Sequence, residues 1–195
     1  PYTTLFRSDL TARMNTDAMR EELVEIAAAT KLALSELMRE NDCSVGAFEC
    51  WSAFPSLIGV CPCVALGEMA DEGYPLACEA DVNGAITLAI LRACSLYEKP
   101  PFLADLTIRN PIHDNSELLW HCGPFPYSLK AEDSPAALVD GQERFRMRPG
   151  HMTTCRFDDA EGKYYLFAGE GDTTEGPETN GTYVRSEEHT SELQS

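Results

Sequence analysis

The stretch YPLACEADVNGAITLAILRACSL, residues 74–96, decides the fold class that this sequence predicts. Residues 74–78 are short and apolar and follow a glycine, which is typical of a buried strand. Residues 82–96 form a long, strongly apolar segment, which predicts a helix packed against a core. A buried strand that leads directly into an apolar helix is the repeating unit of an α/β fold.

The neighbouring segments extend this unit in both directions. Residues 17–40 carry apolar side chains at helical spacing, and residues 61–71 also predict a helix. Residues 44–51 (SVGAFECW) and 101–108 (PFLADLTI) are short apolar runs that predict strands. Since strands alternate with helices, the sequence predicts a parallel sheet with crossover helices.

After Asn110 the helical periodicity disappears. Segments such as ELLWHCG, HMTTCRFDD and KYYLFAGEG alternate or run apolar, with turns expected at 159–162 and 170–181. This pattern predicts an antiparallel β-rich, barrel-like domain. We therefore expect an α/β domain over residues 9–112, which carries the acids discussed below, and a partial β-domain over 113–184.

The two ends of the chain have a different character. Residues 1–8 (PYTTLFRS) and 185–195 (RSEEHTSELQS) match the translations of short-read sequencing adapters. Such segments are set aside before a fold is considered. We expect both to be artefacts, and residues 9–184 to be a truncated piece of a larger protein.

Composition narrows the classes of function. The formal net charge of −17 argues against partners that are nucleic acids or anionic membrane surfaces, and no apolar run is long enough for a membrane span. The eight cysteines lie mostly in apolar periodic segments, which favours reduced, buried thiols and a cytoplasmic location over a disulfide scaffold. The spacing of Cys61 and Cys63 does not fit a zinc knuckle, and packing at a helix start explains it better.

Three side chains suggest chemistry. Glu79 and Asp105 follow or end consecutive predicted strands, and parallel strands with right-handed crossovers would bring those ends side by side. His121 lies on the next predicted strand. Two carboxylates and an imidazole suit Mn²⁺ or Mg²⁺. From spacing alone, solvated acids and a satisfied histidine explain these residues better than a metal site does.

Three sequence blocks resemble a known family. CEADVNGAITLAIL (78–91), PFLADLTIRNPIHDN (101–115) and LLWHCGPFP (118–126) are similar, in order and separation, to the carboxyl-terminal half of the L-fucose/L-arabinose isomerase family. The resemblance extends over most of residues 43–170. It implies that Glu79 and Asp105 bind a catalytic metal and that His121 matches a ligand of the arabinose isomerases, although fucose isomerases lack a histidine ligand there.

The chemistry that this resemblance implies is aldose–ketose isomerisation. Two carboxylates act as base and acid while a proton moves between C1 and C2 through an enediol. A divalent ion, Mn²⁺ or another such as Mg²⁺, polarises the carbonyl. Glu49 and Trp51 are candidate substrate contacts, with core packing as the alternative for Trp51. Cys122 is also a candidate contact, against structural burial. The string GEGD (169–172) resembles an arabinose-isomerase motif, but its polar context predicts that Glu170 is a turn acid.

The leading hypothesis is therefore a metal-dependent ketol isomerase of a sugar such as L-fucose, L-arabinose or D-arabinose. The alternatives are a non-catalytic relative that binds sugar and metal, and a structural fragment whose acids coincide by chance. The resemblance also implies a homo-oligomer and a final histidine ligand, which no residue between Gly171 and Val184 matches. We expect an incomplete site and an inactive polypeptide as written.

Overall fold

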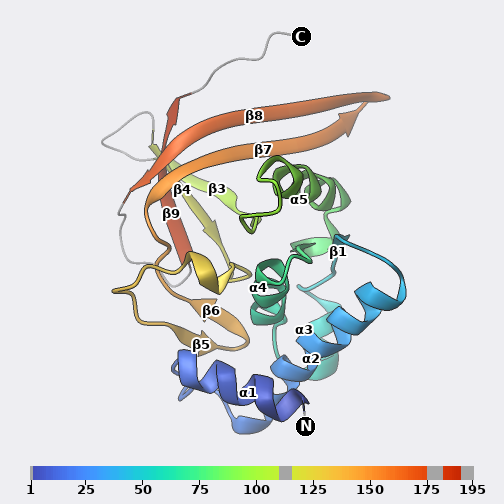
Figure 1. Ribbon diagram of the computed structural model, residues 1–195, viewed down its shortest axis with the longest axis vertical. Coiled ribbons are helices and arrows are strands. Elements are labelled where there is room, and N and C mark those ends of the chain that lie inside the picture. Colours follow the sequence, from blue (N-terminus) through green and yellow to red (C-terminus); the bar gives the residue numbers. More distant parts are fainter. Residues whose placement is uncertain (1, 110–115, 175–181, 190–195) are drawn as a thin grey trace.

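The computed structural model describes residues 2–109, 116–174 and 182–189. Helices dominate the first half and strands the second, as the sequence predicted (Figure 1). The helices are α1 (Tyr2–Arg13), α2 (Glu21–Glu40), α3 (Ala53–Ile58), α4 (Cys63–Asp71) and α5 (Val82–Cys94), with 3-10 turns η1 (Cys78–Ala80) and η2 (Tyr127–Leu129). The strands are β1 (Gly46–Ala47), β2 (Leu76–Ala77), β3 (Asp105–Arg109), β4 (Ser116–His121), β5 (Ala137–Val139), β6 (Gln142–Arg144), β7 (Gly150–Ala160), β8 (Lys163–Thr174) and β9 (Thr182–His189).

The predicted helices over residues 17–40, 61–71 and 82–96 are confirmed within a few residues by α2, α4 and α5. Helix α4 lies in the interior of the helical half, since all of its residues except the last are buried. One face of α2 packs on it, where Leu34 and Met38 meet Leu66 and Met69 in a core cluster. This is the apolar stripe that helical spacing predicts.

The prediction of a parallel sheet is only partly confirmed. Strands β1 and β2 pair in parallel, each over two residues, as expected for a crossover. The third predicted strand does not join them, because β3 pairs antiparallel with β4. The chain segment between β3 and β4 is short, and strands joined by a short connection pair antiparallel because a parallel arrangement needs a long crossover. The expectation of three parallel strands is therefore wrong.

The second half is antiparallel, as predicted, but it is not a closed barrel within the described residues. Five strands form an open sheet in the order β3-β4-β9-β8-β7. The β7–β8 hairpin has its turn at Glu161 and Gly162, inside the predicted turn at 159–162. The prediction that Glu170 is a turn acid is wrong, since β8 continues through it and pairs Glu170 with Thr153.

A small hairpin joins the two halves of the molecule. Strands β5 and β6 are linked by Asp140 and Gly141, whose φ angles of 54° and 77° are those of a type I′ turn. The carbonyls of this turn accept backbone N–H groups from the start of α4: Cys61 donates to Asp140 over 3.1 Å and Val64 to Gly141 over 2.9 Å. The turn thus supplies acceptors for N–H groups that a helix start leaves without partners.

Helix α5 lies beneath the β7–β8 hairpin (Figure 1) and is attached to it by polar contacts. Asp81 caps α5, since its carboxylate accepts the Gly84 N–H at 2.8 Å. The same carboxylate pairs with the Arg156 guanidinium of β7, with a second contact of 3.2 Å. Asp81 is therefore the N-cap of α5.

Replacing Asp81 tests the cap. Asp81→Ala is expected to lower the free energy of unfolding by about 1–2 kcal/mol, because it removes both the cap and a half-exposed ion pair. Asp81→Asn keeps a capping oxygen and should cost less. Denaturant titration of both variants checks this order. Equal losses in the two variants would show that the cap contributes nothing.

Glu143 of β6 is fully buried beside α4, and burial raises the pKa of its carboxyl well above the usual range. The negative charge of Glu68 raises this pKa further, while the positive charge of Arg13 lowers it. The folded chain therefore keeps a proton that the unfolded chain releases above pH about 4.3. This contribution to stability is complete below that pH and is lost as pH rises toward the pKa of the folded state.

The expected result is a free energy of unfolding that falls by about 1.4 kcal/mol per pH unit through this window on account of Glu143. Glu143→Gln, which is neutral at every pH, should remove that slope. Denaturant unfolding at several pH values above about 4.3 measures the difference between the two chains. Parallel pH profiles for the two chains would refute a protonated Glu143.

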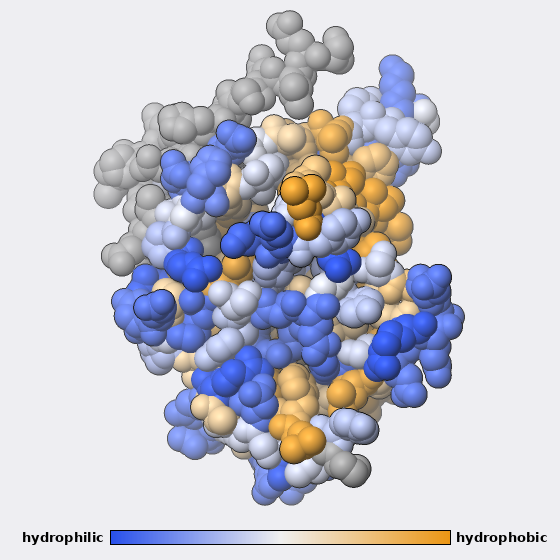
Figure 2. All heavy atoms as spheres, viewed as in Figure 1, coloured by the Kyte–Doolittle hydropathy of each residue, from blue (hydrophilic) through white to orange (hydrophobic). Residues whose placement is uncertain are grey.

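No helix in the described part of the chain is both long and apolar enough to cross a membrane. Figure 2 shows hydrophobic surface over α5 and the adjoining part of the β7–β8 hairpin. Leu166 and Phe167 of β8, with exposures of 52% and 49%, contribute to the exposed apolar surface of the hairpin.

Candidate active site

Glu79 lies in a tight turn between β2 and α5, with an unusual backbone. Glu79 and the following Ala80 both have left-handed conformations, with φ angles of 62° and 56°. Such angles are costly in residues other than glycine and cluster at functional sites. Hydrogen bonds hold the turn: Ala80 donates its N–H to the Phe48 carbonyl over 3.1 Å, and the Glu79 N–H points at the Cys50 sulfur over 3.4 Å. The Glu79 side chain is exposed.

Asp105 and His121 come from adjacent antiparallel strands. Asp105 opens β3 and pairs with Trp120, the residue before His121 on β4. Asp105 is exposed, whereas His121 is 3% exposed. The sequence predicted that Asp105 lies at the end of a parallel strand. Asp105 instead begins an antiparallel strand, and the pairing of this strand with β4 brings it near His121.

The pKa of His121 is set mainly by burial and by the neighbouring Cys122. Burial lowers the pKa of this imidazole, but the contact with Cys122 and its charge raise it, and so do the charges of Asp105 and Glu79. The net effect is a raised pKa. The charges of Asp105 and Glu79 are the smallest of these contributions.

The immediate contacts of His121 constrain what it can bind. Cys122 donates its backbone N–H to Nδ1 of His121 over 2.9 Å, and the Cys122 sulfur lies 3.2 Å from the same nitrogen. The backbone contact requires an unprotonated Nδ1 that accepts the Cys122 N–H. The raised pKa of His121 instead corresponds to a protonated Nδ1 that donates to the Cys122 thiolate. In the neutral ring we assign Nδ1 as the acceptor, because the main chain fixes the direction of the Cys122 N–H. A metal would then have to bind through Nε2 with the proton moved to Nδ1.

The donor chemistry of Glu79, Asp105 and His121 suits a hard or borderline divalent ion. Their arrangement is less complete: the residues described here include no group of three or more histidine, cysteine, aspartate or glutamate side chains placed to hold a metal. The candidate ligands that the sequence predicted are thus two exposed carboxylates and one buried imidazole.

The predicted substrate contacts have different surroundings. The Glu49 carboxylate accepts the N–H groups of Ser52 at 3.0 Å and Ala53 at 3.2 Å, so it binds the start of α3, and these hydrogen bonds lower its pKa. Trp51 is 73% exposed, so core packing does not explain it. Glu49 is thus occupied locally, while Trp51 presents a free ring.

Sequence reasoning missed a cluster of thiols around His121. The sulfurs of Cys63 and Cys122 are 3.6 Å apart, and Cys50 interacts with Cys78 nearby. The hydrogen bond from Cys63 and the contact with His121 lower the pKa of Cys122, while the pKa of Cys63 is raised. These cysteines come from four separate segments, so their spacing carries no signal. The adjacency of His121 and Cys122 was the only local hint.

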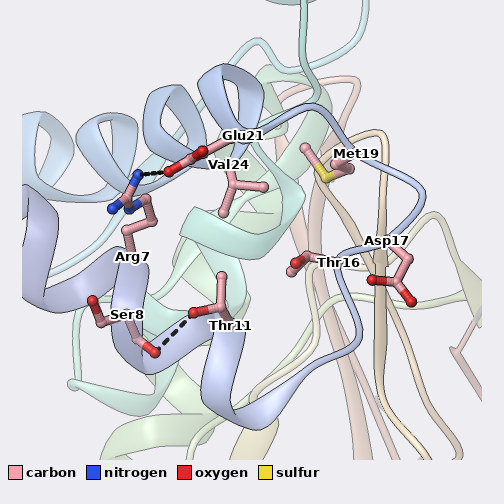
Figure 3. A pocket seen from close by; sticks show the side chains of 8 residues that line it. All are labelled: Arg7, Ser8, Thr11, Thr16, Asp17, Met19, Glu21 and Val24. Atoms are coloured by element: carbon pink, nitrogen blue, oxygen red, sulfur yellow. Dashed lines mark hydrogen bonds and ion pairs between the residues drawn. The ribbon is translucent and has the colours of Figure 1, made fainter.

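One pocket of about 460 Å³ lies between α1 and the start of α2 (Figure 3). Arg7 and Glu21 face each other across it and form an ion pair. It contains none of the predicted site residues, and Arg7 and Ser8 belong to the segment that matches an adapter. We assign it no role.

Comparison with known proteins places the chain beside sugar isomerases. No family model matches it. It is 29% identical over 160 residues to the sulfoquinovose isomerase of Alkalicoccus urumqiensis, covering 78% of this chain and 36% of that protein. It is 28% identical over 158 residues to the sulfoquinovose isomerase of Priestia megaterium, covering 77% and 35%. The chain thus spans about a third of the length of these relatives, which bear the name of sugar isomerases, the enzyme class that the resemblance over 43–170 implied.

Proposed function

We propose that this chain is part of an aldose–ketose isomerase, in which Glu79 and Asp105 form the acid–base pair. The observation that carries the proposal is that Asp105 pairs with Trp120, the residue before the buried His121, so that an exposed carboxylate and a buried imidazole come from neighbouring positions of the sheet. The similarity to sulfoquinovose isomerases supports the same class of reaction.

The residues would act on C1 and C2 of an open-chain sugar. One carboxylate removes the proton from C2 while the other protonates the carbonyl oxygen at C1, which gives the enediol. A proton is then delivered to C1 as the hydroxyl at C2 loses its proton, which gives the ketose. The exposure of Glu79 and Asp105 leaves both carboxylates open to a bound sugar. The left-handed turn at Glu79 fixes the point at which its side chain leaves the backbone.

We propose Mn²⁺, or another divalent ion such as Mg²⁺, as the cofactor, held by Glu79, Asp105 and Nε2 of His121. When bound, such an ion polarises the sugar carbonyl and stabilises negative charge on the adjacent oxygens. Since His121 is buried, it would hold its ring in place while the exposed acids adjust to ligand.

Sulfoquinovose is the substrate that we put first, because the relatives bear that name. L-fucose, L-arabinose and D-arabinose follow from the resemblance in the sequence blocks. The exposed ring of Trp51 is the proposed stacking surface for a sugar, and the partly buried Cys122 is a proposed contact beside His121.

A chimaera tests this function. In the Priestia megaterium relative, the matching segment is replaced by the corresponding residues of this chain. The expected result is conversion of sulfoquinovose that stops when a chelator removes divalent ions and resumes when Mn²⁺ is added. A folded chimaera that converts none of the four sugars would contradict the proposal. Circular dichroism and size-exclusion chromatography establish whether the chimaera is folded.

One observation favours a second candidate, a non-catalytic relative that binds sugar without a metal held by His121. Nδ1 of His121 already accepts the Cys122 N–H, which opposes the tautomer that a metal at Nε2 requires. A folded chimaera that binds sulfoquinovose but neither binds Mn²⁺ nor converts the sugar would support this candidate.

A further inference from the structure

The cysteine pair behind His121 has the geometry of a covalent switch. Cys63 is the first residue of α4, and Cys122 directly follows β4. Their sulfurs lie 3.6 Å apart, which is van der Waals contact, although 59 residues separate them in sequence. A disulfide bond needs about 2.05 Å between its sulfurs, so side-chain movement of about 1.6 Å closes the gap.

The two thiols differ in access to solvent. Cys63 is 2% exposed, whereas Cys122 is only partly buried. A small oxidant therefore reaches Cys122 first, and Cys63 is the only thiol in the described residues with a sulfur-to-sulfur contact to it. The other interacting pair, Cys50 and Cys78, is 5% and 0% exposed, so solvent does not reach it.

We propose that Cys122 and Cys63 form a peroxide-sensitive disulfide beside the candidate active site. A hydroperoxide transfers one oxygen to the Cys122 thiol, giving a sulfenic acid and releasing water or an alcohol. The Cys63 thiol then attacks the Cys122 sulfur, the S–O bond breaks, and the oxygen leaves as water with the thiol proton. The peroxide is reduced and the two thiols are oxidised, with the loss of two hydrogens from the protein.

This disulfide would act on His121. The Cys122 sulfur is 3.2 Å from Nδ1 of His121 and must turn toward Cys63 to form the bond. It would then no longer offer a thiol to the imidazole. The formation of the disulfide does not depend on the proposed isomerase function, so the failure of one leaves the other standing.

The test is mass mapping of the reduced chain after a brief treatment with hydrogen peroxide. Remaining thiols are alkylated, and the protein is digested without reduction. We expect one dominant linked pair of peptides, containing Cys63 and Cys122, and the loss of two of the eight alkylatable thiols. The same treatment in concentrated guanidinium chloride should give scattered pairings.

Variants sharpen the result. Cys122→Ser and Cys63→Ala should each abolish the linked pair, while Cys155→Ser, which removes a partly buried thiol on β7, should leave it unchanged. Over-oxidation of Cys122 with Cys63 still alkylatable would overturn the proposal. So would identical pairings in native and denatured chains, a result that needs no variant to fold.

Discussion

Glu79→Gln and Asp105→Asn are each expected to reduce isomerase turnover by roughly 10²–10⁴-fold in the chimaera described above, while the fold stays intact. Each substitution keeps the size and hydrogen-bonding oxygen of the side chain but removes its capacity to take or give the proton. Both side chains are exposed, so neither change leaves a buried cavity. Measurement of kcat with sulfoquinovose at saturating Mn²⁺ checks this.

The matched control for this prediction is Glu170→Gln. Glu170 lies in the GEGD string that imitates a family motif, yet it is an exposed residue of β8. Its substitution should leave turnover unchanged. Retained activity in Glu79→Gln or Asp105→Asn, or an equal loss in Glu170→Gln, would refute the assigned roles.

The second large effect concerns stability rather than chemistry. Gly141→Ala is expected to lower the free energy of unfolding by roughly 3–5 kcal/mol. The glycine has a φ of 77°, and a Cβ placed on it would lie 1.9 Å from the Cys61 carbonyl oxygen and 2.7 Å from a Val60 methyl. The β5–β6 turn would have to leave the start of α4. Denaturant unfolding measures the loss.

Gly162→Ala is the matched comparison for Gly141→Ala. Gly162 has a similar φ of 74°, but a Cβ there meets no atom within 4 Å. Gly162→Ala should lower the free energy of unfolding by only about 1–2 kcal/mol, which is the cost of a left-handed backbone in a residue with a Cβ. If Gly141→Ala costs no more than Gly162→Ala, the close contact between the turn and α4 is not what stabilises this junction.

The helices could be predicted because their apolar spacing reports burial directly. The end of α2 at Glu40 and the start of α5 at Val82 follow from local patterns of this kind. The partner of β3 could not be predicted, since an apolar run does not specify which strand it joins. All residues of β3 are exposed in the structure, although the apolar run PFLADLTI predicted a strand of the parallel sheet.

The candidate site was predicted in its members but not in its geometry. Glu79 and Asp105 were assigned to neighbouring ends of parallel strands, yet Asp105 opens an antiparallel strand. The left-handed backbone at Glu79 has no sequence signal, because such positions usually contain glycine. The contact between Cys63 and Cys122 depends on how α4 packs near the end of β4, which local sequence does not specify.

The most direct test of the central claim is isomerisation in heavy water. If Glu79 and Asp105 move a proton through an enediol, the ketose that the chimaera forms from sulfoquinovose in D₂O should carry deuterium at C1, as read by proton NMR. The Glu79→Gln chimaera should give neither product nor exchange. A ketose formed without solvent deuterium would contradict the account, because a proton carried by these exposed carboxylates would exchange with the solvent.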